Sequence, residues 1–364
     1  MDPRARADRR SDGRTHPRGH GRQLALSRPL AHLLLLALAL GGAGGNASDY
    51  SWRLPRGFPL PAVPADNPMS QAKVDLGRAL FFDPRLSVTG HFACASCHEP
   101  ARAFSDGRRV AQGATGAALP HNAMALVNVA YNISFGWSRR EPRTLEAQML
   151  EPMLNEHPVE LGLKGRQAAL ASTLAADPVS ARAFAAAFPG DPAPVSFRHT
   201  VQAIAAFERT LISGASPFDR YVFSGEHAAL SAPAKAGMAL FFSSRGGCSA
   251  CHSGINFAGN YRDAQGETGR ASFARNGTSG QPMRVPTLRN SAYSAPYMHD
   301  GRFATLAEVI EHYSGLARAG APLPDKRLPR TPFSAGEEQE LLAFLASLDD
   351  PSFVARYAQS TAPH

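Results

Sequence analysis

The chain has 364 residues, four cysteines and a formal charge of +8 at pH 7. Residues 1–29 contribute a net +5 of that charge, from eight arginines and three aspartates, and so leave about +3 for the rest of the chain. Because no basic run with interleaved aromatic residues follows, this composition does not indicate a nucleic-acid partner.

The N-terminal segment has the order typical of a secretory signal peptide. Its arginine-rich part is followed by an apolar run from Leu30 to Leu40, and then by small residues up to Ala47. This succession of basic, apolar and small residues indicates export. We therefore predict a signal peptide over residues 1–47 and a periplasmic protein. The apolar run is short for a membrane span, so we expect membrane contact only if the leader stays uncleaved.

Four cysteines in an exported protein would ordinarily suggest two disulfides. Instead, the chain contains two copies of Cys-x-x-Cys-His, at Cys94, Cys97 and His98 and at Cys248, Cys251 and His252. In this motif the two thiols add to the vinyl groups of one haem and the histidine binds its iron. A redox dithiol, a zinc site and disulfides are alternatives. The histidine that follows both cysteine pairs favours two covalently bound haem c groups.

The two motifs lie inside a longer internal repeat. Residues 79–82 and 239–242 both read Ala-Leu-Phe-Phe, and each run ends a helical stretch that we expect to bury its aromatic end against a haem. Downstream, Thr144 and Thr305 each precede an amphipathic helix, and Thr305 forms a capping box with Glu308. Strand patterns are nearly absent. The sequence therefore predicts a mostly α fold of two related cytochrome c-like haem lobes with long loops.

Two further helices set the predicted boundaries. One covers Ser196–Ile212, and the other is a last helix that Ser334 and Glu337 cap. We predict an N-terminal haem domain over residues 48–195 and an inter-lobe helix and linker over 196–230. A C-terminal haem domain over 231–350 and a tail over 351–364 complete the chain.

The residue opposite each iron follows from the register of the repeat. Eight residues after Thr144 and Thr305 stand Pro152 and Tyr313. Proline has no donor atom for iron, so the first haem is expected to keep an open sixth position, whereas tyrosine can ligate ferric haem. A core tyrosine hydrogen-bonded to a neighbour is the alternative for Tyr313. Three residues are rival ligands of the second iron: Met283, Met298 and His312.

Two polar residues are candidates for proton transfer in the first site. Gln148 lies one helical turn before Pro152, and Glu160 follows in the segment after that helix. Peroxide activation needs a group that moves a proton from the near oxygen to the far one, and a carboxylate in a desolvated pocket suits that step. An ordinary solvated side chain is the alternative for both.

From about Pro61 to Leu348 the chain resembles the bacterial di-haem cytochrome c peroxidase and MauG family. Besides the haem motifs, the resemblance rests on four strings: Leu80–Ser87, Ala103–Gly107, Pro286–Asn290 and Ala295–Arg302. It implies a peroxidatic N-terminal haem domain and an electron-transfer C-terminal one. The residues to which it assigns roles are an inter-haem tryptophan at Trp137, distal residues at Gln148, Pro152 and Glu160, and a sixth ligand at Tyr313. It also implies a calcium ion held by the Asn122 side chain and the carbonyls of Ser294 and Pro296.

The sequence departs from the family pattern at three places. No histidine lies between His98 and His121, so the histidine that many of these peroxidases release on reduction is expected to be missing. One residue is added between Trp137 and the glutamine. Two more are added between Pro152 and Glu160, which leaves Glu156 as an alternative to Glu160.

Proline opposite one haem and tyrosine opposite the other is the MauG-type arrangement. By that resemblance, hydrogen peroxide takes both irons to a high-valent pair, which then oxidises a side chain of a secreted partner protein. The segment Glu156–Gly162 is similar to an MbnH-like subgroup, and this implies tryptophan as the oxidised side chain. A peroxidase that reduces hydrogen peroxide to water with electrons from a small redox protein is the first alternative. A non-catalytic electron-transfer protein is the second, and the open distal site argues against it.

Overall fold

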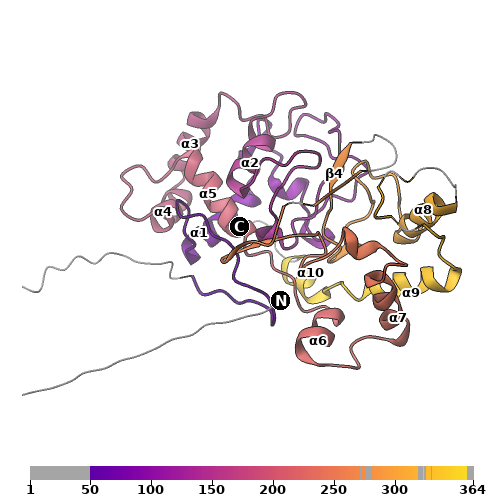
Figure 1. The fold of residues 1–364 in the computed structure, drawn as a ribbon. Coiled ribbons are helices and arrows are strands. Elements are labelled where there is room, and N and C mark those ends of the chain that lie inside the picture. The colour runs from indigo at the N-terminus through magenta and orange to yellow at the C-terminus, as the bar shows by residue number, and fades with distance from the viewer. Residues whose placement is uncertain are drawn as a thin grey trace, which may run out of the picture. The chain divides into compact units, whose positions relative to one another are not determined.

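The computed structural model describes residues 50–270, 272–275, 281–318, 323, 325–328 and 330–358. The predicted leader, residues 1–47, lies outside them. All the described residues belong to one compact unit. Helices and long loops dominate the described part and strands are few and short, so the predicted mostly α fold is confirmed (Figure 1). None of the described helices is both long and apolar enough to cross a membrane.

The helices follow one another in chain order as α1 (Gln71–Phe81), α2 (Leu145–Leu154), α3 (Gln167–Ala176), α4 (Pro178–Ala187), α5 (Phe197–Glu208), α6 (Pro217–Ser224), α7 (Ala232–Phe242), α8 (Leu306–Arg318), α9 (Ala335–Ala346) and α10 (Pro351–Ala358). Two short antiparallel ribbons pair β1 (Arg262–Asp263) with β2 (Gly266–Glu267), and β3 (Phe273–Arg275) with β4 (Pro282–Arg284).

Two helix pairs repeat the same close crossing. In Figure 1, α1 and α5 lie among the indigo to magenta helices, whereas α7 and α9 lie together in the other half of the drawing. Gly77 of α1 stands so close to α5 that an added Cβ would lie 1.9 Å from the carbonyl oxygen of Ala203. Gly237 of α7 has the same relation to Glu340 of α9, at 1.8 Å. A glycine is therefore required at both crossings, because any side chain would push the helices apart.

The helices that follow the haem motifs begin with equivalent caps. The Thr144 hydroxyl accepts a hydrogen bond from the Ala147 amide at 3.1 Å, and the Thr305 hydroxyl accepts one from the Glu308 amide at the same distance. The Glu308 carboxylate in turn accepts from the Thr305 amide at 2.8 Å. The predicted capping box is thus confirmed. The shared cap gives α2 and α8 the same register relative to their threonines.

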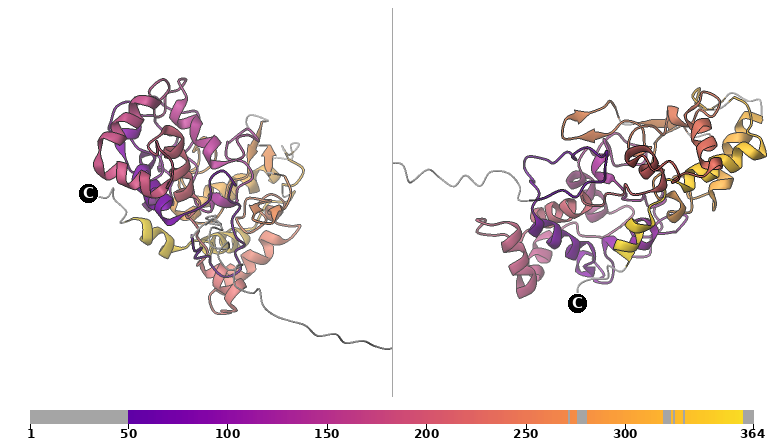
Figure 2. Two further views of the ribbon diagram at one scale, coloured as in Figure 1. Left: turned by 90° about the vertical axis from the view of Figure 1, so that its left-hand side faces the viewer. Right: turned by 90° about the horizontal axis from the view of Figure 1, so that it is seen from below.

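The C-terminal end differs from the predicted tail. Pro351 opens α10, and the Asp350 carboxylate accepts from the Phe353 amide at 3.1 Å. Phe353 is completely buried, with its ring 6.1 Å from that of Phe104 between centroids. Both views of Figure 2 draw this yellow helix against the indigo and violet N-terminal segments. The last helix of the chain, α10, therefore completes the core around the first haem motif.

A single serine joins the two repeats. Asn128 and Asn290 both adopt a left-handed backbone, with φ of 55° and 56°. The Asn128 side chain donates to the Ser213 carbonyl and accepts from its amide, at 2.9 and 2.7 Å. The Asn290 amide group donates to the Ser213 hydroxyl at 2.8 Å. All these atoms are buried, so the bonds are shielded from water and fix the repeats to one another.

Candidate haem sites

The first Cys-x-x-Cys-His motif is held in a short 3₁₀ turn, Cys94–Ser96. His98 follows, and its Nδ1 lies 2.9 Å from the carbonyl oxygen of Phe104. A carbonyl only accepts, so Nδ1 carries the proton and Nε2 keeps a free lone pair. Phe104 has a φ of 61°, a left-handed conformation that costs a non-glycine residue on the order of 1 kcal/mol or more.

The second motif repeats this arrangement. Cys248–Ala250 forms the 3₁₀ turn, and His252 Nδ1 lies 2.9 Å from the carbonyl oxygen of Phe257, whose φ is 48°. Burial lowers the pKa of both His98 and His252, which favours the neutral ring that binds a metal. None of the four cysteines is in a disulfide. Paired free thiols beside a neutral, oriented imidazole are the donor set that a covalently bound haem requires.

A cavity of about 770 Å³ adjoins the first motif. His98, Cys94 and Cys97 line it together with the inter-haem candidate Trp137 and the three residues expected on the distal side, Gln148, Pro152 and Glu160. Pro152 lies inside α2, where it presents no ligand atom. The structure therefore brings together all the sequence-predicted residues of the first site.

Glu160 and its alternative Glu156 have different surroundings. Glu160 lines the cavity, and burial, followed by the nearby Glu151 carboxylate, raises its pKa. Glu156 is exposed and forms an ion pair with Lys164, which lowers its pKa. Of these two glutamates, Glu160 is therefore the one with the location and the raised pKa that suit proton exchange in a desolvated pocket.

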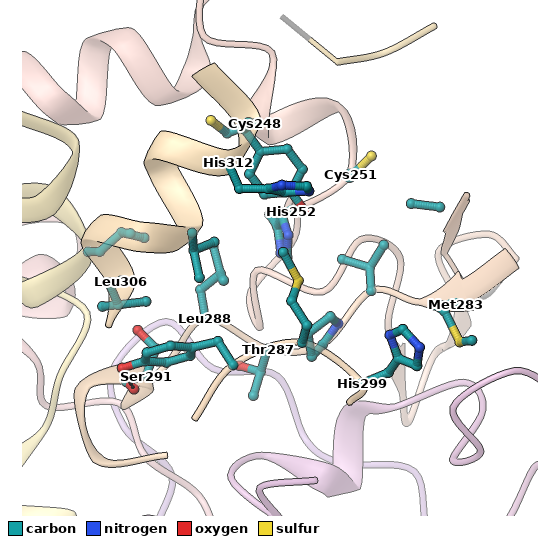
Figure 3. Close-up of a pocket in the computed structure, with 18 of the residues that line it drawn as sticks. Cys248, Cys251, His252, Met283, Thr287, Leu288, Ser291, His299, Leu306 and His312 are labelled. Carbon is teal, nitrogen blue, oxygen red and sulfur yellow. Dashed lines mark hydrogen bonds between the residues drawn. The ribbon is translucent and has the colours of Figure 1, made fainter. Parts of the chain in front are cut away.

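The second cavity, about 280 Å³, is lined by His252, Cys248, Cys251 and Tyr313 (Figure 3). Burial, followed by the nearby Cys251 and Cys248, raises the pKa of Tyr313 to about 12. The rival ligands Met283, Met298 and His312 line the same cavity. In Figure 3, Met283 and His299 lie side by side, away from Cys248. Tyr313 and its three rivals all line this cavity, so the lining alone does not identify the ligand of the second iron. The register of the helix must decide between them.

The aromatic residues before the two haem motifs differ in how far they are buried. Phe241 lines the second cavity, but Phe242 is 49% exposed. Phe81 is buried among core phenylalanines, including Phe104 and Phe207. The expectation that each run buries its aromatic end is therefore wrong for Phe242, because the last turn of α7 directs the two successive side chains to different sides of the helix.

Trp137 lies between the cavities and lines both. Its indole Nε1 donates to the Asn122 carbonyl at 2.8 Å, and its own carbonyl accepts from the Arg284 amide at 2.7 Å. The rings of His121 and His299 lie 6.4 and 6.5 Å from the indole ring between centroids. One bond thus holds the Trp137 ring and the other holds its backbone, in the wall that the two cavities share.

The three residues assigned to calcium, Asn122, Ser294 and Pro296, all line the second cavity. The Asn122 amide nitrogen donates to the Arg108 carbonyl at 2.6 Å, so the side-chain oxygen is the atom available for a cation. His121 lines the first cavity, and burial, followed by His299, lowers its pKa.

Glu208 and Arg284 are among the charged residues of the cavities that the sequence analysis did not identify. Glu208 ends α5 and lines the first cavity, and burial raises its pKa to about 8. Its Oε2 has no hydrogen-bond partner among the described residues. Arg284 ends β4 and lines both cavities. The sequence does offer a signal for Glu208, because its charge directly follows the apolar stretch 203–207. No periodic pattern marks the position of Arg284.

Two haem-attachment motifs in one mostly helical unit, each with its own cavity, define a di-haem c-type cytochrome. The family model for di-haem cytochrome c peroxidase matches residues 71–228. Methylamine utilization protein MauG of Methylorubrum extorquens is 36% identical over 82% of this chain and 83% of its own length. Cytochrome c551 peroxidase of Pseudomonas aeruginosa is 32% identical over 77% and 80%.

Among solved structures, a MauG-like protein associated with microbial copper homeostasis is 34% identical. It superposes with a TM-score of 0.80 and covers 86% of this chain and 99% of its own. The chain therefore belongs to the di-haem cytochrome c peroxidase and MauG family, whose members are peroxide-dependent oxidoreductases.

Proposed function

We propose that this protein is a MauG-type oxidase. It uses hydrogen peroxide to oxidise a side chain of a secreted partner protein, and we propose tryptophan as that side chain. The observation that carries the proposal is the shared register of α2 and α8. Pro152 and Tyr313 stand eight residues after threonines whose hydroxyls cap their helices at the same position, and each lines the cavity of its own haem motif. This register favours Tyr313 over Met298 and His312 as the group opposite His252.

The haem pair supplies the redox chemistry, with His98 and His252 as proximal ligands and the four cysteines as attachment points. Around the first haem, Gln148 orients peroxide and Glu160 moves the proton between its oxygens. Burial favours the protonated form of Glu160, so its carboxyl can donate to the departing oxygen. Pro152 keeps the position opposite His98 free for peroxide.

Trp137 connects the two sites. Reduction of one hydrogen peroxide to two waters takes up two electrons and two protons. In the proposed reaction the partner's side chain would supply these electrons, and Trp137, which lines both cavities, would relay them between the two sites. Tyr313 as phenolate would stabilise the oxidised state of the second haem, where methionine would favour the reduced one.

The proposal includes a calcium ion and an exported location. Asn122, Ser294 and Pro296 would hold the ion through oxygen atoms, which calcium prefers. Residues 1–47 would direct the chain to the periplasm. Addition of a chelator to the haem-loaded protein, followed by optical spectroscopy, tests the first point. N-terminal sequencing of protein from a periplasmic extract tests the second.

The central experiment compares the optical spectrum of the ferric protein before and after one equivalent of peroxide, without reductant. The parent should show a high-spin ferric component at rest and form a long-lived oxidised spectral state. Tyr313→Phe should change the resting spectrum and lose that state. The control is Tyr297→Phe, which alters the other tyrosine of the second cavity and should retain both properties. An unchanged Tyr313→Phe spectrum would remove the basis of the proposal.

A cytochrome c peroxidase activity is the second candidate, because relatives at 32% identity bear that name. The two functions differ in their electron donor. Peroxide consumption should be compared with reduced cytochrome c and with a tryptophan-containing peptide, the latter followed by mass spectrometry. Rapid turnover with cytochrome c and an unmodified peptide would favour the peroxidase.

A further inference from the structure

Arg284 is a buried cation that lacks an anion within the described protein. The residue is 8% exposed, and its Nε has no hydrogen-bond partner among the described residues. One Nη lies 2.6 Å from the thioether sulfur of Met124, which is a weak acceptor and carries no charge. Burial lowers the pKa of Arg284 to about 10, and no neighbouring carboxylate opposes this effect. An isolated buried charge is strongly unfavourable, so this position requires an anionic partner.

The acids near Arg284 do not supply that partner. The first cavity is lined by Glu151, Glu160 and Glu208, and none of them forms an ion pair with Arg284 in the described structure. The described lining of the second cavity contains no aspartate or glutamate, although it contains Arg275 and Arg327 as well as Arg284. The missing negative charge must therefore come from what the cavities bind.

The backbone places Arg284 at the boundary of the two sites. Its amide donates to the Trp137 carbonyl at 2.7 Å, and its side chain lines both cavities, as the Trp137 indole does. Haem carries two propionate side chains, and the planar fork of an arginine matches a carboxylate in two parallel hydrogen bonds.

We infer that Arg284 is the shared counter-ion of the two haems, pairing with propionate groups that reach its guanidinium from both cavities. It is a positioning residue that couples the sites electrostatically. A cation next to both haems favours their reduced forms, so its removal should lower both midpoint potentials. The inference requires two bound haems and is independent of the side chain that the protein oxidises.

The test is spectropotentiometric titration of haem-loaded Arg284→Gln, with Arg275→Gln as the control. Arg275 lies on the paired strand β3, lines only the second cavity and is exposed. We expect both midpoint potentials to fall in Arg284→Gln and neither to move as far in Arg275→Gln. Unchanged potentials, a shift at one haem only, or equal shifts in the two variants would each overturn the inference.

A stability measurement tests the pairing independently of the potentials. If Arg284 pairs with propionates, Arg284→Met should lower the denaturation midpoint of the haem-loaded protein, because the carboxylates lose their cation. If the guanidinium is unpaired, the same change removes an isolated charge and raises the midpoint. Should Arg284→Met not fold, Arg284→Lys retains the charge and should fold with both potentials close to the parent's. Failure of both variants to fold would contradict a role that rests on charge.

Discussion

The ion pair of Arg289 and Asp219 should be a main determinant of stability around the second haem. Its two N–H···O bonds are 2.9 Å long, and the two side chains are 1% and 3% exposed. Arg289 Nε also donates to the Ile255 carbonyl at 2.8 Å, within the loop that carries the carbonyl partner of His252. Arg289→Met leaves the Asp219 carboxylate buried without its cation. Loss of one partner of such a pair costs about 3–5 kcal/mol.

The assay is urea unfolding of the haem-loaded protein, followed by absorbance at both haems. Arg220→Met is the control, since Arg220 pairs with Glu226 on the surface at 3.5 Å and should cost less than about 1 kcal/mol. The double variant Arg289→Met/Asp219→Asn should recover part of the loss, because no isolated charge remains. A cost below about 1 kcal/mol for Arg289→Met, or a double variant no more stable than the single one, would refute this reasoning.

Three further changes test the packing and the titration of the fold. Asp349 is buried, which raises its pKa to about 6 from an ordinary 3.8. The folded state then binds the proton more tightly than the unfolded state, so stability falls as pH rises from about 4 to 6. In urea unfolding, Asp349→Asn should gain up to about 3 kcal/mol at pH 7 and little at pH 3.5, whereas an equal gain at both would contradict this cause. Gly237→Ala should lose about 3 kcal/mol in thermal unfolding, because its Cβ would meet the Glu340 carbonyl at 1.8 Å. Gly315→Ala on α8 has open space and should be neutral or stabilising, so similar losses would disprove the steric explanation. Phe353→Ala should cost about 3–5 kcal/mol and disturb the first haem spectrum before the second. Equal disturbance of both haems would argue against the assigned contact.

The sequence predicted those features that depend on local patterns. The haem motifs, the threonine caps and the eight-residue register are short-range features, and the caps were confirmed because they satisfy backbone groups within one turn. Neither the unpaired Arg284 nor α10 was anticipated. Arg284 is functional only because two cavities meet at it, and α10 is held by Phe104, some 250 residues earlier in the chain. Such contacts arise from tertiary packing and leave no periodic signal.

The packing of α10 on the first haem loop has a consequence for biosynthesis. Domains generally fold from the N-terminus during synthesis, but here the phenyl group that covers Phe104 belongs to residue 353. The loop that orients His98 therefore acquires its final support only after almost the entire chain has been made. We therefore expect the core against which Cys94 packs to remain incomplete until the last helix of the chain has been made.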